Sequence, residues 1–153
     1  MSEKTKILVV DDNEVVRRSF LRSLAGAQCK VEAAWNGEEA LHAMERQAFD
    51  VVLLDLRMPG MDGMEVLKVI KDKWPETEVV VITGYACVES AKEAVRLGAC
   101  NYLAKPVGPV DVINAANDAV TQKKWTLHRD RASHEASTVP RTASGERTGS
   151  AAC

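Results

Sequence analysis

The sequence predicts an α/β fold, a doubly wound parallel sheet of five strands with helices on both faces. Three runs of four consecutive Val, Ile and Leu residues, at 7–10, 51–54 and 79–82, have the pattern of strands buried on both faces of a parallel sheet. Segments with helical spacing of apolar residues alternate with these runs. The connections are short, as in βαβ units with right-handed crossovers.

The predicted strands differ in how apolar they are. The runs 7–10, 51–54 and 79–82 contain no polar residue and should be central, whereas the segments 31–35 and 101–104 are more mixed and should lie at the edges. This placement gives the strand order 2-1-3-4-5, with the switch point between the first and third strands. That order is the one found in flavodoxin-like folds.

Helices are expected over 13–25, from 37, and over 63–74, 88–97 and 109–124. Asn36 and Asp62 are N-cap candidates, because each precedes a glutamate by three residues. Pro109 fits the first turn of the last helix, where its missing N–H costs nothing. The apolar stripes of these helices are, in order, Val16, Phe20 and Leu24; Leu41 and Met44; Val66, Leu67, Ile70 and Trp74; Val88, Ala91 and Val95; and Ile113, Ala116 and Val120.

Composition and charge narrow the class of function. A chain of 153 residues fits one domain, and its net charge of -2 gives no electrostatic reason to expect nucleic acid or a membrane surface as a partner. The apolar runs are far shorter than a membrane span, and residues 1–4 lack a signal-peptide pattern. The four cysteines are scattered, without the spacing of a zinc site, which suggests a reducing compartment. We therefore expect a cytoplasmic protein.

The character of the chain changes after Leu127. Residues 128–153 are mainly Ser, Thr, Ala, Arg and Gly with almost no apolar periodicity, so they cannot offset the entropy of ordering. We expect a folded domain over 4–125 and a disordered polar tail over 126–153. The tail is too short and too polar for a helix-turn-helix effector.

Polar side chains stand where four of the predicted strands end. Asp11 and Asp12 follow the first strand, Asp55 follows the third, Thr83 ends the fourth and Lys105 follows the fifth. Parallel strands bring these ends to one edge of the sheet, where open α/β sheets bind ligands. Three converging carboxylates repel one another unless a cation is present, and Mg²⁺ prefers such oxygen ligands.

Each of these residues has a plainer interpretation when taken alone. Asp12 could be the N-cap of the helix that begins at Asn13, and Asp11 and Lys105 could be solvated loop residues. Thr83 could be an ordinary β-branched strand residue. Together they provide a nucleophilic carboxylate, a pair of metal ligands, a hydroxyl and an ammonium, the groups needed to move a phosphoryl group onto an aspartate.

Motifs at these strand ends resemble those of the receiver domains of two-component response regulators. They are VVDD at 9–12, LLDLRMPGMDG at 53–63, ITGY at 82–85 and YLAKP at 102–106. The resemblance covers roughly residues 4–124. The sequence around Thr83 and Lys105 is most similar to that of receivers of enhancer-binding activators. Since no effector motif follows Lys124, a stand-alone receiver is expected, although the chain could equally be the receiver part of a larger regulator.

The resemblance implies a role for each matched residue. Asp55 would accept a phosphoryl group from a histidine kinase or a histidine phosphotransfer protein, and Lys105 would contact that group. Mg²⁺ would be bound by Asp55, by Asp12 directly, by Asp11 mainly through water, and by the backbone carbonyl of Arg57. The protein would be no enzyme beyond assisting its own phosphotransfer and slow dephosphorylation.

The resemblance also implies a switch made of Thr83 and Tyr102. Thr83 would move toward the phosphoryl group and leave space into which the Tyr102 ring can turn. The output face would then consist of the helix over 88–97, the strand with Tyr102 and the last helix, and would bind a downstream protein or a second copy after phosphorylation.

Arg57 and Tyr85 each lie two residues beyond a site residue and are bulky. We expect them to shield the phosphoryl group from water, unless both simply point to solvent.

Three other functions compete with this one. A haloacid-dehalogenase-like phosphatase also uses a strand-end aspartate and Mg²⁺, but it would need a second acid where Arg57 stands. A flavodoxin-like binding module would have to hold a flavin phosphate against the carboxylates of Asp11 and Asp12. A receiver-like module could also act by protein contact without phosphorylation, although the complete set of site residues argues against it.

Overall fold

The three wholly apolar runs form the centre of a parallel sheet in the computed structural model of the chain, which describes residues 4–25 and 29–135. The strands are β1 (Thr5–Val10), β2 (Cys29–Ala34), β3 (Val51–Leu54), β4 (Glu78–Thr83) and β5 (Asn101–Ala104). Their order is β2-β1-β3-β4-β5 and every neighbouring pair is parallel. The predicted fold class and strand order are confirmed.

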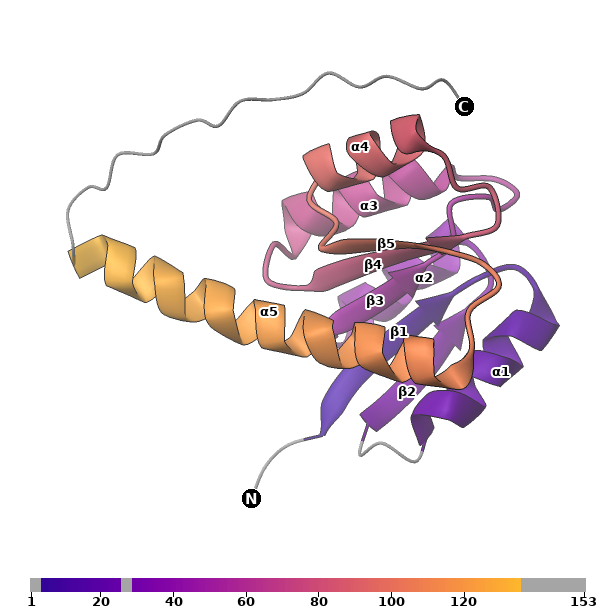
Figure 1. Cartoon of the computed structure of the whole chain (residues 1–153), viewed down its shortest axis with the longest axis horizontal. Coiled ribbons are helices and arrows are strands. Elements are labelled where there is room, and N and C mark those ends of the chain that lie inside the picture. Colours follow the sequence, from indigo (N-terminus) through magenta and orange to yellow (C-terminus); the bar gives the residue numbers. More distant parts are fainter. Residues whose placement is uncertain (1–3, 26–28, 136–153) are drawn as a thin grey trace.

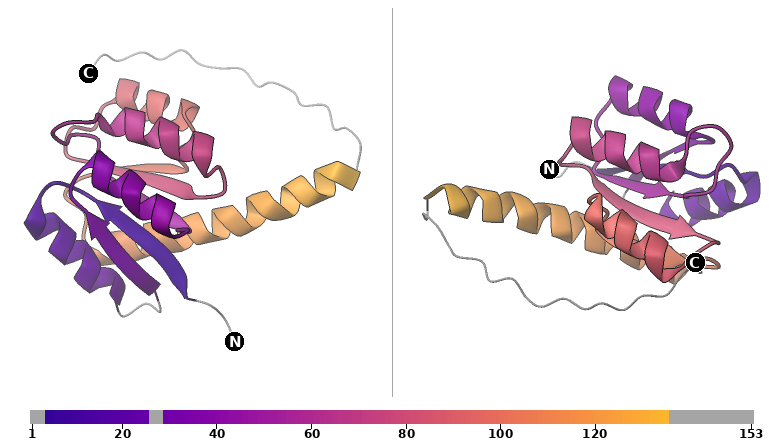
Figure 2. Two further views of the ribbon diagram at one scale, coloured as in Figure 1. Left: turned by 180° about the vertical axis from the view of Figure 1, so that it is seen from behind. Right: turned by 90° about the horizontal axis from the view of Figure 1, so that it is seen from above.

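Five helices cover the two faces of this sheet. They are α1 (Glu14–Ala25), α2 (Gly37–Arg46), α3 (Gly63–Lys73), α4 (Val88–Arg96) and α5 (Pro109–Glu135). Figures 1 and 2 show α1 and α5 on one face and α2, α3 and α4 on the other. The carboxyl ends of the five parallel strands lie at one edge of the sheet, where the loops to all five helices begin.

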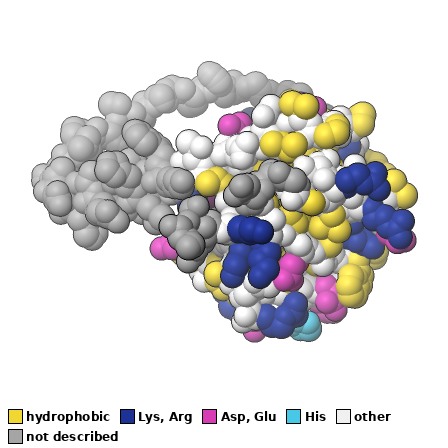
Figure 3. Space-filling view, turned by 90° about the horizontal axis from the view of Figure 1, so that it is seen from below, with side chains coloured by type: hydrophobic (Ala, Val, Ile, Leu, Met, Phe, Trp, Pro, Cys, Tyr) yellow, Lys and Arg dark blue, Asp and Glu magenta, His cyan; other side chains and the backbone are white. Residues whose placement is uncertain are grey.

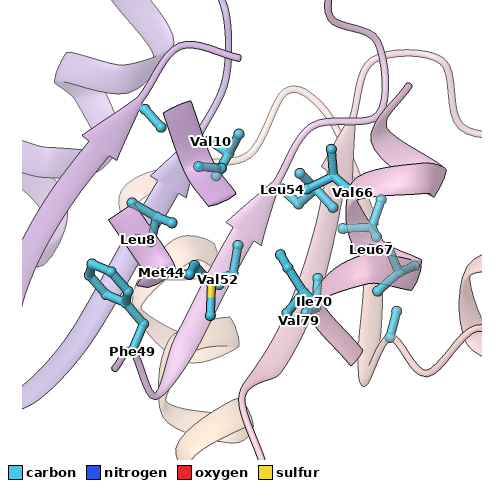
Figure 4. Packing of buried hydrophobic residues seen from close by; sticks show 14 of the residues in the cluster. Leu8, Val10, Met44, Phe49, Val52, Leu54, Val66, Leu67, Ile70 and Val79 are labelled. Carbon is cyan, nitrogen blue, oxygen red and sulfur yellow. The ribbon is translucent and has the colours of Figure 1, made fainter. Parts of the chain in front are cut away.

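Alternate residues of the central strands supply two separate cores. Leu8, Val52 and Val79 face α2 and α3, where they pack with Met44 and Ile70 (Figure 4). Ile7, Val9, Val51, Leu53, Val80 and Ile82 face α1 and α5. All these strand residues are at most 1% exposed, which is the reason for their unbroken apolar sequence.

The last helix continues past the predicted end near Lys124. It runs to Glu135 and extends beyond the sheet in Figures 1 and 2. Residues 126–135, which were expected in a disordered tail, are therefore helical. The rest of that predicted tail, 136–153, lies outside the described residues.

Two predicted apolar stripes are wrong in detail. In α5 the buried residues are Val112, Ala115, Ala116 and Ala119, and the predicted Ile113 and Val120 are only partly buried. In α4 only Ala94 is buried, whereas the predicted Val88 and Val95 are 48% and 59% exposed. The reason is that α4 rests on the sheet edge through a small residue and leaves its larger apolar residues outside.

Figure 3 shows both signs of charge on the described part of one face. Basic and acidic side chains lie interspersed there with hydrophobic ones, in keeping with the net charge of -2. Among the residues that the structure describes, none of the helices combines the length and the apolar character that a membrane span requires.

Candidate functional site

Three carboxylates lie together at the carboxyl ends of β1 and β3. Asp11 directly follows β1, Asp12 is its neighbour, and Asp55 directly follows β3. One carboxylate oxygen from each lies within 4.8 Å of the others. Asp11 and Asp55 are buried and Asp12 is exposed, so this acidic cluster (Asp11, Asp12 and Asp55) meets solvent on the Asp12 side.

The polar groups of Asp11 have partners in several parts of the fold. Its N–H donates to the carbonyl of Ala34 at the end of β2 (3.1 Å). Its Oδ1 accepts from the N–H of Asn13 (2.9 Å), and its Oδ2 accepts from Nζ of Lys105 (2.6 Å). Its carbonyl accepts from the guanidinium of Arg17 in α1 (2.8 Å). These hydrogen bonds hold Asp11 in place, so it is not the solvated loop residue of the plainer interpretation.

Asn13, and not Asp12, caps α1. Oδ1 of Asn13 accepts from the N–H groups of Val15 (2.9 Å) and Val16 (3.2 Å). The interpretation of Asp12 as an N-cap is therefore wrong. Within the described parts of the chain, the Asp12 carboxylate has no hydrogen-bond partner, which leaves its oxygens available to a ligand.

Lys105 reaches the acidic cluster from the loop after β5. Its Nζ lies 2.6 Å from Oδ2 of Asp11 and 3.6 Å from Oδ2 of Asp55. Its N–H donates to the carbonyl of Thr83 (2.9 Å), and its peptide bond with Pro106 is cis. Since the lysine side chain is only 20% exposed, it is no ordinary solvated loop residue.

The surroundings of Asp55 favour its neutral form. Burial has the largest effect and raises the pKa of this carboxyl, and the charge of Asp11, with a smaller contribution from Asp12, raises it further. Lys105 and the N–H of Arg57, which lies 3.4 Å from Oδ1, lower the pKa without cancelling these effects. An added cation would act in the opposite direction and lower this pKa.

A cavity of about 290 Å³ adjoins the acidic cluster and is lined by it together with Lys105, Arg57 and Tyr85. The guanidinium carbon of Arg57 lies 4.0 Å from the centre of the Tyr85 ring. Although Tyr85 is 62% exposed, the two side chains do not point away independently. They form a paired wall on the outer side of the cavity.

Thr83 and Tyr102 lie outside this lining. Thr83 is fully buried, and its Oγ1 accepts from the N–H of Tyr85 (3.1 Å), so it stands behind the paired wall. Tyr102 is half-buried at the edge of the sheet, and its hydroxyl shares a hydrogen bond with the hydroxyl of Ser90 in α4. The N–H of Cys87 also approaches the Tyr102 hydroxyl (3.4 Å).

The sequence prediction did not include Asn13, Arg17 or Ser90 among the residues around the site. The N-cap role of Asn13 could have been predicted, because asparagine is a preferred N-cap residue just before a segment with helical spacing of apolar residues. The contacts of Arg17 and Ser90 join residues across the fold and have no counterpart in sequence spacing.

The acidic cluster suits a hard divalent cation. It offers carboxylate oxygens from a buried residue pair and from Asp12, an exposed residue to which no group of the described residues donates. Such a set, open to water on one side, matches the ligands that Mg²⁺ accepts. The backbone carbonyl of Arg57, predicted as a further ligand, belongs to a residue that lines the same cavity.

The chain matches the family model described as response regulator receiver domain over residues 7–117. It is 42% identical over 106 residues to the regulatory protein AtoC of Escherichia coli K12, a match that covers 69% of this chain and 23% of AtoC. It is 41% identical over 100 residues to the DNA-binding transcriptional regulator NtrC of the same strain, covering 65% of this chain and 21% of NtrC. The chain thus spans less than a quarter of the length of these relatives.

Solved structures agree with this match. A CheY-like receiver domain protein from Methanospirillum hungatei JF-1 superposes with a TM-score of 0.77 at 28% identity, covering 80% of this chain and 98% of that one. NtrX from Brucella abortus superposes with a TM-score of 0.79 at 30% identity, covering 84% of this chain and 29% of NtrX. The strand order, the acidic edge of the sheet and these likenesses lead to one conclusion: the chain belongs to the response regulator receiver domain family.

Proposed function

We propose that this protein is a phosphorylated switch of two-component signal transduction, with Asp55 as the phosphoryl acceptor. The observation that carries the proposal is the position of Asp55 inside the cavity. It is the one buried carboxylate there that is not hydrogen-bonded to Lys105, which donates to Asp11 at 2.6 Å and lies 3.6 Å from Asp55. A carboxylate oxygen of Asp55 is thus available to accept a phosphoryl group.

The site residues divide the work of phosphotransfer. A carboxylate oxygen of Asp55 bonds to phosphorus as the phosphorus–nitrogen bond of a phosphohistidine breaks. Asp11, Asp12, Asp55 and the Arg57 carbonyl would hold Mg²⁺, which when bound supplies positive charge beside the phosphoryl oxygens. Lys105 has only to shift from Asp11 toward Asp55 to meet the new negative charge.

In this proposal, phosphorylation of Asp55 changes the conformation of Thr83, Tyr102 and the start of α4. Phosphorylation would draw the Thr83 hydroxyl from the N–H of Tyr85 toward the phosphoryl oxygens. Tyr102, whose hydroxyl is bonded to Ser90, would follow and release the start of α4. The face made of α4, β5 and α5 would then bind a downstream protein or a second copy of the chain.

The partner that supplies the phosphoryl group is, in this proposal, a histidine kinase or a histidine phosphotransfer protein. The protein would act by contact rather than as an enzyme on a separate substrate. The receiver portion would bind no nucleic acid directly, because a net charge of -2 gives the chain no electrostatic attraction to a polyanion. Its expected cytoplasmic location stays a prediction.

Acetyl phosphate and Mg²⁺ test the central claim without the cognate kinase. The protein is incubated with both and its intact mass is followed, with Asp55→Asn as the matched variant. One added phosphate that is absent from Asp55→Asn supports the receiver function. Continued release of inorganic phosphate from a simple phosphomonoester would instead support the phosphatase, and no added phosphate at all would favour the module that acts by contact alone.

A further inference from the structure

The carbonyl of Asp11 lies just beyond the end of the β1–β2 ladder. The last bond of that ladder runs from the N–H of Asp11 to the carbonyl of Ala34. In a parallel pair the next donor would be the N–H of Asn36. However, β2 ends at Ala34, and Asn36 already serves as the N-cap of α2, with its Oδ1 accepting from Glu39 (2.8 Å). The Asp11 carbonyl therefore needs a donor from elsewhere.

Arg17 is that donor. It stands in the first turn of α1, and its Nη1 donates to the Asp11 carbonyl at 2.8 Å. Its own N–H donates to the carbonyl of Asn13 at 3.0 Å. Arg17 thus binds both ends of the turn that carries Asp12, the start through its side chain and the end through its backbone.

The position of Asp12 depends on this turn. Its carboxylate has no donor among the described residues, so no side-chain contact holds it beside Asp11 and Asp55. The carbonyl of Asp11 and the nitrogen of Asp12 belong to one planar peptide unit. A donor that fixes this carbonyl therefore also fixes the direction in which the chain enters Asp12.

We propose that Arg17 is a positioning residue, which holds the Asp12 carboxylate at the acidic cluster through its hydrogen bond to the Asp11 carbonyl. The inference rests on the proposed Mg²⁺ site. Residues that orient metal ligands change metal affinity by about 10- to 100-fold, and we expect Arg17→Met to weaken Mg²⁺ binding by about tenfold. Charge alone predicts the opposite sign, because removing a cation from the neighbourhood of a cation site strengthens binding.

Calorimetric titration with Mg²⁺ separates the two effects. Arg18→Met is the matched control, since Arg18 lies in the same helix and carries the same charge. Among the described residues it forms only a surface ion pair with Glu14 (3.0 Å, with the arginine side chain 70% exposed). We expect its affinity to equal that of the wild type or to be slightly higher. Arg17→Lys, which keeps one donor and the charge, should bind Mg²⁺ more tightly than Arg17→Met.

A second measurement needs no metal. The N–H of Asn13 donates to Oδ1 of Asp11 inside the same turn, so its hydrogen exchange reports how well the turn is held. In metal-free protein this amide should exchange several-fold faster in Arg17→Met than in the wild type and Arg18→Met. Unchanged exchange together with unchanged or tighter Mg²⁺ binding would overturn the proposal.

Failure of the proposed function would look different. If the wild type bound no Mg²⁺, or if Asp12→Asn left its affinity unchanged, the metal site itself would be refuted, and with it the effect of Arg17 on the metal. Faster exchange of the Asn13 amide in Arg17→Met would then still show that Arg17 holds the turn.

Discussion

Arg57 and Tyr85 come from loops after different strands, yet they meet over the cavity. The 4.0 Å separation between the guanidinium carbon and the ring centre is that of a cation–π contact. Tyr85 is also bonded through its N–H to Thr83, and the N–H of Arg57 lies near Asp55. The wall is therefore attached through its backbone to both residues beside which it stands.

We expect this wall to slow hydrolysis of the phosphorylated protein. Arg57→Ala or Tyr85→Ala should shorten the lifetime of the phosphorylated form by a factor of about 3 to 10, which corresponds to roughly 1 kcal/mol, the size of a cation–π contact. The lifetime is measured by intact mass after removal of excess acetyl phosphate with Mg²⁺ present. Arg46→Ala, an exposed arginine at the far end of α2, is the control. Equal lifetimes in all four proteins would contradict the shielding.

Gly63 shows how closely α3 approaches the segment that carries Asp55. A Cβ atom at this position would lie 2.5 Å from the Cα of Leu56 and 2.8 Å from the carbonyl oxygen of Asp55. Both neighbours are backbone atoms, which cannot move aside as the end of a side chain can.

Gly63→Ala should therefore displace the segment that carries Asp55. We expect a loss of roughly 1–3 kcal/mol in the free energy of unfolding, together with slower phosphorylation by acetyl phosphate. Urea unfolding and intact mass measure the two effects. Gly108→Ala is the control, because its nearest neighbour, Oδ2 of Asp111, is 3.9 Å away. A fully stable and reactive Gly63→Ala would show that α3 can move without disturbing Asp55.

At the scale of elements, α4 is the least anchored helix of the described fold. It buries one residue, Ala94, whereas α2 and α3 bury four each. Its first turn is capped by Cys87 and is joined to β5 by the shared hydrogen bond between Ser90 and Tyr102. An element with few apolar contacts is easily shifted, which suits the proposed output face.

Ser90→Ala should release the start of α4. The variant removes the hydrogen bond to Tyr102 and the longer contacts of the same hydroxyl with the sulfur and the carbonyl of Cys87 (3.3 Å each). We expect a total loss of about 1 kcal/mol, so amides around 88–91 should exchange about fivefold faster. Hydrogen exchange followed by NMR tests this. Ser23→Ala is the matched control, because the hydroxyl of Ser23 donates to the carbonyl of Ser19 in its own helix and, in the described part of the chain, to no other element. Equal exchange in Ser90→Ala and the wild type would mean that other contacts hold α4.

At the scale of the whole molecule, Asp50 ties the sheet to the longest helix. Its Oδ2 accepts from the N–H of Lys6, the second residue of β1 (2.9 Å). Its Oδ1 accepts from Nζ of Lys123 in α5 (2.7 Å). Burial opposes ionisation, but these two partners outweigh it and lower the pKa of Asp50. Asp50 directly precedes β3, so the Asp50–Lys123 ion pair lies at the amino end of this strand, opposite the acidic cluster at its carboxyl end.

The ion pair between Asp50 and Lys123 makes the free energy of unfolding depend on pH. Because the pKa of Asp50 is lower in the folded than in the unfolded protein, its contribution is present above about pH 4, the unfolded value, and is lost as the pH falls through the native pKa. Asp50→Asn should lower the free energy of unfolding at pH 7 by about 1 kcal/mol, a value reduced for partial exposure. Urea unfolding should show the difference shrinking toward zero at low pH.

Glu45→Gln is the control for this measurement. Glu45 also pairs with a lysine, Lys73, at 2.7 Å, but both side chains are more than half exposed. We expect no measurable change at either pH. A pH-independent loss in Asp50→Asn would assign its effect to packing rather than to charge.

Most of the fold could be predicted from the sequence because it depends on local patterns. Unbroken Val, Ile and Leu runs require burial on both faces, and that requirement places β1, β3 and β4 at the centre. The end of α5 could not be predicted, because the sequence beyond Lys124 has no apolar period, whereas the helix runs to Glu135. The face of α4 was misjudged for a related reason, since the sequence does not show how small a contact with the sheet suffices.

The sequence by itself determined the strand order and the edge at which Asp11, Asp12, Asp55, Thr83 and Lys105 would gather, because parallel strands leave no other place for residues that follow them. Only the tertiary structure decided which groups touch. It pairs Lys105 with Asp11 more closely than with Asp55, and it places Arg17 on the Asp11 carbonyl. Side-chain contacts between distant elements depend on ångström distances, and residue spacing along the chain does not specify them.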